Sequence, residues 1–148
     1  MKNKLFVNVT SAKNRPDYAA ELESIKEAGI CPFCPDNVKK YLSKIIYREG
    51  RHWLIADATY PYKNAKYHFI LVHHAHIENA SDISEEGWSE LKEFVDWICG
   101  LKQIKGATLI MRFGDTNCTG ASVTHLHASL VSGDGDQKDR EPVLTRVG

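Results

Sequence analysis

The stretch of residues 123–131 constrains the fold more than any other, because apolar and polar residues alternate along it. Successive side chains of a strand point to opposite faces, so His125, His127 and Ser129 are expected to share one face. The residues between them are apolar and are predicted to face a core: Leu126, Ala128 and Leu130. A purely structural strand rarely places two neighbouring imidazoles on one side. The stretch therefore predicts a strand with a chemical role.

The length of 148 residues favours one domain. The 19 basic residues balance 19 acidic ones, and no basic run predicts a track for nucleic acid or for a membrane surface. No apolar run reaches the roughly 20 residues of a membrane span, and the N-terminus lacks the apolar stretch of a signal peptide. We therefore expect a cytoplasmic protein whose phosphate specificity, if any, comes from a local site.

Two segments show the spacing of amphipathic helices. Residues 16–28 begin with proline, repeat apolar residues at helical spacing and stop at Gly29. A second helix is predicted after a cap at Asp82 or Ser84, with two glutamates in its first turn and an end at Gly100. These helices are well separated in the chain, with strand-like segments before and after the second one.

Five segments are rich in β-branched and aromatic residues and predict strands: 44–48, 51–57, 67–73, 107–113 and 122–131. The first two flank Glu49-Gly50 and predict a hairpin. Several strands follow one another directly, which favours an antiparallel α+β sheet of about five strands with helices on one face over a doubly wound parallel sheet. Beyond Ser132 the chain is too polar to pack by itself.

Among the four cysteines, Cys31 and Cys34 form a C-x-x-C pair. In a reducing compartment this spacing favours a metal or redox role over a disulfide framework. The pair does not open a helix after a strand, which argues against a thioredoxin-like motif. Cys99 and Cys118 are interpreted as ordinary buried thiols.

These motifs together resemble the histidine triad (HIT) superfamily, in which His-x-His-x-His lies along a strand and the middle histidine attacks the α-phosphate of a nucleotide. In chain order they are C-P-F-C from Cys31, H-x-x-x-V-x-x-x-H-I from His68, and G-A-S-x-x-H-x-H from Gly120. The resemblance implies a HIT-like domain over residues 30–131, after an arm and helix at 1–29 and before a polar tail at 132–148.

The resemblance makes His127 the nucleophile, with its other ring nitrogen held by a backbone carbonyl, and His125 the first histidine of the triad. A neutral imidazole is a good nucleophile near pH 7 and a good leaving group afterwards. Ser129 replaces the third histidine, and a serine hydroxyl has too high a pKa for efficient acid catalysis. This favours nucleotidyl transfer or dinucleoside polyphosphate cleavage over phosphoramidate hydrolysis.

Phosphate binding is expected at the turn that leads into this strand, because backbone N–H groups and a hydroxyl can meet phosphate oxygens there. The turn residues are Gly120, Ala121 and Ser122, and weaker candidates are Asn117 and Arg112. The resemblance implies nucleoside-binding roles for two more residues, Asp57 toward the ribose and His68 facing the active site. Tyr60 and Tyr62 are expected either to pack on a base or to fill their loop. Arg140 or Arg146 of the tail is a further candidate for phosphate contact, over a partner's site.

Relatives in this superfamily complete a zinc site with two histidines, which here are His76 and His125 beside Cys31 and Cys34. Four nitrogen and sulfur donors leave no open position, so a bound Zn²⁺ would be structural. His73 and His74 are competing ligands, and a metal-free knuckle with reduced thiols is the alternative.

The sequence therefore predicts an enzyme of the hydrolase or nucleotidyltransferase type that acts on a nucleotide or dinucleoside polyphosphate through a nucleotidyl-histidine. The alternative is a catalytically degenerate nucleotide-binding or regulatory protein, which Ser129 motivates. Trp88, Phe94 and Trp97 widen the apolar face of the helix expected at 84–99, which fits either a homodimer or a thick monomer core.

Overall fold

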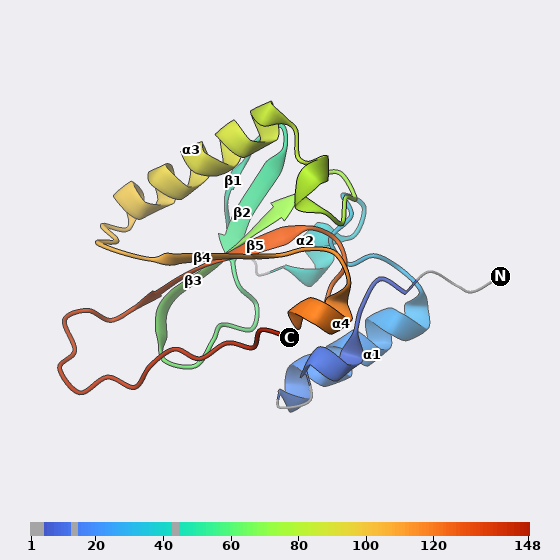
Figure 1. The fold of residues 1–148 in the computed structure, drawn as a ribbon, viewed down its shortest axis with the longest axis horizontal. Helices are drawn as coiled ribbons and strands as arrows, with labels where there is room; N and C mark the ends of the chain where they lie inside the picture. The colour runs from blue at the N-terminus through green and yellow to red at the C-terminus, as the bar shows by residue number, and fades with distance from the viewer. Residues whose placement is uncertain (1–4, 13–14, 43–44) are drawn as a thin grey trace.

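The computed structural model describes residues 5–12, 15–42 and 45–148. Its centre is a five-stranded sheet with the order β1-β2-β3-β5-β4, in which all neighbouring strands are antiparallel (Figure 1). The strands are β1 (Ile46–Glu49), β2 (Trp53–Asp57), β3 (Ala65–His73), β4 (Thr108–Arg112) and β5 (His127–Gly133). The predicted antiparallel α+β architecture is confirmed. Lys44, where the first strand was expected to begin, lies outside the described residues.

The histidine strand begins later than predicted, at His127, because the preceding segment has other hydrogen-bonding partners. The backbone of Ser122 and Thr124 bonds to the N-terminal arm around Phe6 and Asn8, and an isolated bridge joins Val7 to Val123. Residues 5–8 thus act as a short neighbouring strand for this segment.

Helix α3 (Glu85–Leu101) covers one face of the sheet. Ser84 caps it, with its hydroxyl accepting a hydrogen bond from the Gly87 N–H at 3.0 Å, and the helix runs through Gly100 instead of ending there. Its buried side chains pack against apolar residues of β2, β3 and β5 in one core cluster, which includes Trp53, Ile55, Phe69, Leu71, Leu91, Phe94, Ile98, Ala128 and Leu130.

The other face is covered by the N-terminal segments, which are η1 (Val9–Ala12), α1 (Pro16–Ala28) and α2 (Val38–Tyr41). Leu22 and Ile25 of α1 share a second core cluster with Leu54, Ala56 and Val72 of the sheet. Helices α1 and α3 accordingly lie on opposite sides in Figure 1. This corrects the expectation of helices on one face, since β2 is buried on both sides.

Glu90 of α3 fastens the β1–β2 hairpin. Its carboxylate accepts hydrogen bonds from the backbone N–H groups of Arg51, His52 and Trp53, at 2.8, 2.7 and 2.6 Å. Burial acts to raise the pKa of Glu90, but these three bonds hold it below its usual value. A Cβ atom at Gly50 would lie 2.6 Å from the Glu90 carboxylate, so a side chain at this turn position would have to displace that carboxylate.

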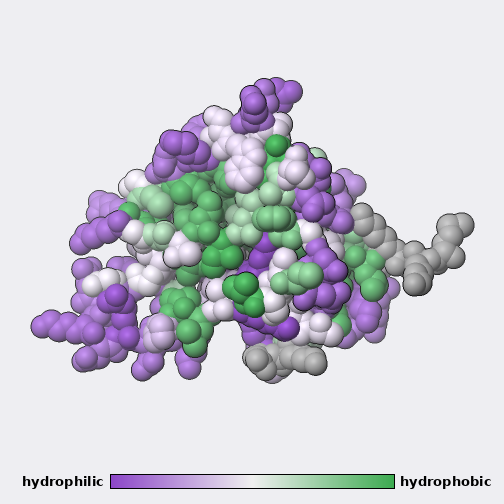
Figure 2. All heavy atoms as spheres, in the orientation of Figure 1, coloured by the Kyte–Doolittle hydropathy of each residue, from purple (hydrophilic) through white to green (hydrophobic). Residues whose placement is uncertain are grey.

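Apolar side chains also gather on the surface between α3 and β4 (Figure 2). Trp88 is 44% exposed, Leu109 43% and Phe113 52%. Phe94, by contrast, is buried, so it belongs to the core rather than to this surface. Of the two remaining cysteines, Cys118 is exposed in α4 (Thr116–Thr119) and Cys99 is half-buried, which corrects the expectation that both are buried. In the described part of the chain, no helix has the length and apolar character needed to cross a membrane.

Candidate functional site

A cavity of about 200 Å³ opens beside the first residues of β5. The strand register brings Arg112 of β4 opposite His127, and Ile70 of β3 opposite Ser129. The cavity is lined by seven of the predicted site residues: His68, Arg112, Gly120, Ala121, Ser122, His127 and Ser129. Parts of β3, β4 and the segment 120–129 thus meet at one cavity.

A backbone carbonyl two residues earlier in the chain orients the imidazole of His127. Its Nδ1 lies 2.8 Å from the carbonyl oxygen of His125. A carbonyl only accepts hydrogen bonds, so Nδ1 carries the hydrogen and Nε2 keeps its lone pair. Burial lowers the pKa of His127, the bond to His125 acts against this, and the Arg112 charge adds to the lowering. The ring is therefore neutral near pH 7, and the edge of Phe33 packs against it with ring centroids 5.0 Å apart.

The turn before β5 presents both a backbone bend and a hydroxyl to the cavity. Gly120 has φ 73°, a left-handed conformation that favours glycine. The Nε of Arg112 donates to the carbonyl oxygen of Thr119 at 3.1 Å, which fastens the turn to the sheet. Ser122 shares a short hydrogen bond with the hydroxyl of Tyr18 from α1.

Two predicted site residues lie elsewhere. Asp57 is on the α3 side of the sheet, where both carboxylate oxygens accept from the Tyr47 hydroxyl at 3.2 Å, and the neighbouring Ala58 lines the cavity instead. Asn117 is exposed in α4 and accepts a hydrogen bond from the Asn8 amide at 3.2 Å. These positions correct the expected contacts of Asp57 with ribose and of Asn117 with phosphate.

His68 points into the cavity and contacts Ser129. Its Nδ1 accepts the backbone N–H of Tyr62 at 3.0 Å, so the hydrogen of the neutral ring is on Nε2, which lies 3.0 Å from the Ser129 hydroxyl. Burial, together with the charges of Arg15 and Arg112, lowers the pKa of His68 to about 4. His68 is thus a neutral donor to Ser129.

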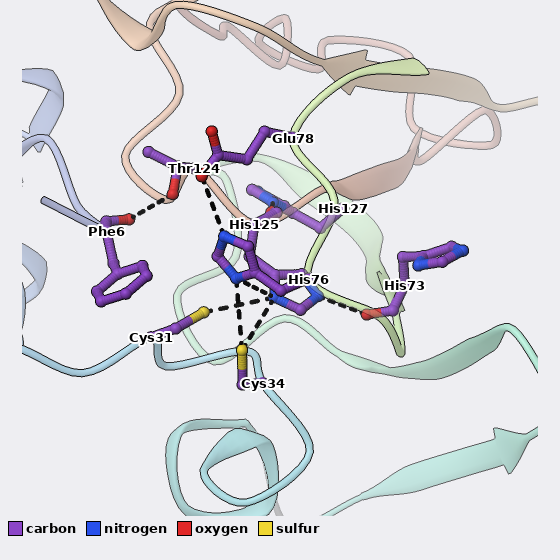
Figure 3. Close-up of polar contacts among 9 residues, drawn as sticks. All are labelled: Phe6, Cys31, Cys34, His73, His76, Glu78, Thr124, His125 and His127. Atoms are coloured by element: carbon purple, nitrogen blue, oxygen red, sulfur yellow. Dashed lines mark hydrogen bonds and ion pairs between the residues drawn. The ribbon is translucent and has the colours of Figure 1, made fainter. Parts of the chain in front are cut away.

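A second group of side chains lies beside the start of β5, next to His127 (Figure 3). One ligand atom from each of Cys31, Cys34, His76 and His125 lies within 4.8 Å of all the others. The closest pairs are His76 Nδ1 and His125 Nδ1 at 3.2 Å, Cys31 Sγ and His125 Nδ1 at 3.4 Å, and Cys34 Sγ and His76 Nδ1 at 3.4 Å. The ring of His125 is therefore directed to this cluster and not into the cavity.

The donor set fits Zn²⁺. Tetrahedral ligands at about 2.0 to 2.3 Å from a zinc ion are separated by roughly 3.3 to 3.8 Å. Four of the atom pairs, at 3.2 to 3.7 Å, are close to this range, and all the ligand atoms lie within 4.8 Å of one another. The far nitrogens of both rings also have acceptors: His76 Nε2 meets Glu78 at 3.0 Å and His125 Nε2 meets the His73 carbonyl at 2.5 Å. Such partners place the hydrogen on Nε2 and leave Nδ1 free to coordinate.

The competing histidines have other roles. His73 Nδ1 donates to the Ala75 carbonyl at 3.0 Å, and His74 Nε2 donates to the Gly50 carbonyl at 2.9 Å. Neither belongs to the cluster with the two cysteines. Their predicted role as alternative ligands is therefore not supported by the geometry.

Several cavity residues were not foreseen. Tyr18 was expected only as part of an apolar helix face, and Arg15 and Thr145 were not considered. Arg112 donates to the Thr145 hydroxyl at 2.8 Å and to the Arg146 carbonyl at 2.6 Å, so the last residues of the chain lie on the rim. Arg146 was considered for a partner's site but lies at the cavity of its own chain. No sequence spacing connects such distant segments.

Comparisons with known proteins give the architecture a context. No family model matches the sequence, and a search of curated proteins finds no match. Among solved structures, a histidine triad protein from Clostridium difficile is 22% identical, with a TM-score of 0.56 over 75% of this chain and 96% of that one. A HIT family hydrolase from Clostridium thermocellum is 26% identical, with a TM-score of 0.51 over 69% of this chain and 90% of that one. A zinc-bound histidine triad family protein from Mycobacterium smegmatis is 20% identical, with a TM-score of 0.54 over 76% and 82%.

The fold and the cavity define an α+β protein in which His127, the first residue of the inner strand β5, presents a neutral imidazole to the cavity. The chain has the fold of the histidine triad superfamily. The fold that its motifs led us to expect is therefore confirmed.

Proposed function

We propose that the protein is a hydrolase or nucleotidyltransferase that cleaves the α-phosphate bond of a nucleotide substrate through a covalent nucleotidyl-His127. The observation that carries the proposal is the orientation of His127, whose Nδ1 hydrogen is engaged by the His125 carbonyl while the ring lines the cavity. A neutral ring held in this way has its Nε2 lone pair available to attack phosphorus. The fold it shares with a HIT family hydrolase supports the same class of reaction.

Charge that develops on the phosphate oxygens needs donors at the same point. Ser122 and the turn at Gly120 supply a hydroxyl and backbone N–H groups beside His127, and Arg112 supplies a nearby positive charge. Fixed donors of this kind stabilise a phosphoryl-transfer transition state without reorganising. We assign these residues to the phosphate group, with Ala121 completing the turn and His68 and Ser129 beside the leaving group.

The apolar part of the cavity wall suits a nucleoside. Phe33, Tyr41, Leu42 and Ile70 line the cavity together with the polar groups around His127. A cavity with an apolar wall and a few convergent polar groups is typical of small-molecule sites. We infer that a nucleotide or dinucleoside polyphosphate lies with its base on this wall and its α-phosphate at His127.

Zn²⁺ is proposed as a structural ion held by Cys31, Cys34, His76 and His125. A bound zinc ion would contribute folding energy and would fasten the N-terminal knuckle to β5. The zinc-bound histidine triad protein of the same fold supports this assignment.

We also propose a homodimer that pairs through α3 and β4, the edge strand of the sheet. The exposed apolar side chains Trp88 of α3, Leu109 of β4 and Phe113 after it support the dimer, because such a surface can pack against a second copy. In this reading, residues 30–131 form the HIT-like domain, while 1–29 and 132–148 add walls to its cavity.

The test is to trap the covalent intermediate. The protein is incubated with dinucleoside polyphosphate carrying a radiolabelled α-phosphate and is quenched in alkali, and label on the protein is then measured before and after acid. We expect acid-labile label in the wild type, none in His127→Ala, and the wild-type amount in His74→Ala, whose imidazole binds Gly50 away from the cavity. Binding of nucleoside monophosphate without turnover, followed by a gain of activity in Ser129→His, would instead establish the degenerate regulatory alternative.

A further inference from the structure

Tyr62 lies where the cavity meets the His68–Ser129 pair. It belongs to the loop between β2 and β3, and its ring packs on that of His68 with centroids 4.3 Å apart and planes inclined at 37°. Its backbone N–H bonds to His68 Nδ1 at 3.0 Å. Both the ring and the backbone of Tyr62 are therefore fixed to a residue of β3.

The hydroxyl of Tyr62 lies beside a positive charge. Arg112 Nη1 donates to it at 3.3 Å, and Arg112 is opposite His127 in the sheet. The hydroxyls of Thr145 and Ser129 act in the same direction, because both favour the charged form of Tyr62. The Tyr62 oxygen is therefore placed where a phenolate would be stabilised.

These contacts have an electrostatic result. Burial acts to raise the pKa of Tyr62, but the Thr145 hydroxyl, the hydrogen bond and charge of Arg112 and the Ser129 hydroxyl together hold it below its ordinary value. Tyr62 is therefore a stronger acid than a free tyrosine.

We propose that Tyr62 is a catalytic general acid that protonates the leaving group, taking the task that Ser129 cannot perform. This role rests on the proposed function of His127. It also widens the substrate class, since esters and amides of a nucleotide with poorly leaving alcohols or amines become accessible. The serine therefore does not by itself exclude such substrates.

The neighbouring groups are less suited to this task. His68 has one hydrogen, on Nε2, which it gives to Ser129. Tyr18 shares its hydroxyl with Ser122, and burial raises the pKa of Tyr18. Tyr62 has both a stabilised conjugate base and a place at the cavity.

The two steps balance as follows. As His127 Nε2 bonds to the α-phosphorus, the bond from phosphorus to the leaving group breaks, and the Tyr62 proton moves to the leaving atom. Water then bonds to phosphorus, the bond to Nε2 breaks, and one proton of that water returns to the Tyr62 phenolate. The net reaction is hydrolysis, and Arg112 faces the transient phenolate.

The experiment compares two leaving groups in Tyr62→Phe, which keeps the ring on His68 and removes only the hydroxyl. The substrates are phenyl and 4-nitrophenyl esters of adenosine, guanosine and uridine 5′-monophosphate, because nitrophenolate leaves without protonation and phenolate does not. We expect kcat/KM for the phenyl ester to fall about a hundredfold, and the ratio of nitrophenyl to phenyl turnover to rise by at least about tenfold. Tyr67→Phe is the matched control, since Tyr67 packs in the core on the α3 side.

The outcomes separate the two proposals. Equal losses for both esters in Tyr62→Phe, with turnover still dependent on His127, would overturn the acid role alone. Absence of any His127-dependent turnover in the wild type would overturn the proposed function and the acid role with it.

If Tyr62→Phe does not fold, Thr145→Val gives an independent readout. It removes a hydroxyl that acts to lower the Tyr62 pKa, so we expect the alkaline limb of the phenyl-ester pH profile to move to higher pH. An unmoved limb would contradict the acid role.

Discussion

The backbone carbonyl of His125 and the ring of His127 are joined by a hydrogen bond of 2.8 Å. The side chain of the same His125 points away from the cavity, into the cluster with the cysteines. One residue therefore belongs to the proposed metal cluster through its ring and orients the proposed nucleophile through its backbone. Loss of the cluster is expected to disturb His127 without any change in the cavity residues themselves.

Cys34→Ser is predicted to lower both zinc content and activity. The variant removes a thiolate whose sulfur lies 3.4 Å from His76 Nδ1 and 3.7 Å from His125 Nδ1. We expect bound zinc to fall from one equivalent toward none, thermal stability to drop, and the nucleotidyl-His127 yield to fall about tenfold or more. Atomic absorption, thermal melting and the labelling assay measure these effects. Cys99→Ser is the control, and equal zinc content in the two variants would refute the assignment.

Stability is predicted to fall below neutral pH because of His68. Its pKa is about 4 when folded and 6.5 at its ordinary value, so the unfolded chain takes up a proton between these values and the folded chain does not. The contribution is fully present above pH 6.5 and is lost as the pH falls toward 4. From about pH 7.5 to about pH 5, His68 should account for about 2 kcal/mol of the loss. Urea unfolding of the wild type and His68→Gln at both pH values measures it, and parallel losses in the two proteins would contradict the prediction.

Glu90→Ala is predicted to destabilise the fold more than Glu93→Ala. Glu90 accepts three backbone N–H groups of the hairpin turn, whereas Glu93 pairs with Arg48 on the surface. Loss of charge-assisted bonds to partly buried amides costs about 2 to 3 kcal/mol, and an exposed ion pair contributes under about 1 kcal/mol. Chemical denaturation of the two variants compares them directly. Equal effects would mean that the turn is held by β1–β2 pairing alone.

The proposed homodimer predicts that Leu109→Glu is monomeric. Leu109 is exposed on β4, and a charge there would oppose pairing with a second copy. Sedimentation should give twice the 16.7 kDa chain mass for the wild type and the single mass for the variant. Lys138→Glu, with its charge change on the tail, is the control. A monomeric wild type at micromolar concentration would refute the dimer.

The predictable part of the site is that carried by local spacing. The period of two along 125–129 placed His127 and Ser129 on one side, and both line the cavity. The resemblance in the cysteine and histidine motifs named the four residues of the metal cluster, which the structure brings together. Both inferences depended on motifs that lie within one segment or on the family pattern as a whole.

The unpredicted part depends on pairing between distant segments. The strand was expected from Ser122, but the N-terminal arm takes the hydrogen bonds of 122–124. The face of the sheet on which Asp57 lies could not be predicted. Both faces of β2 are buried, so its buried and exposed residues do not alternate. Tyr62 was considered only for packing, since its contact with Arg112 joins residues 50 apart in the sequence.

The N-terminal arm and the C-terminal residues of the described chain meet at the turn of residues 120–122. Ser11 donates to the Ala121 carbonyl at 3.0 Å, and the backbone of Gly148 lies 3.4 Å from the position that a Cβ atom of Gly120 would occupy. Any purification tag fused after Gly148 would start at the mouth of the cavity. Recombinant material is therefore best prepared with a cleavable tag, because a tag at this position can itself block the cavity and lower the measured activity.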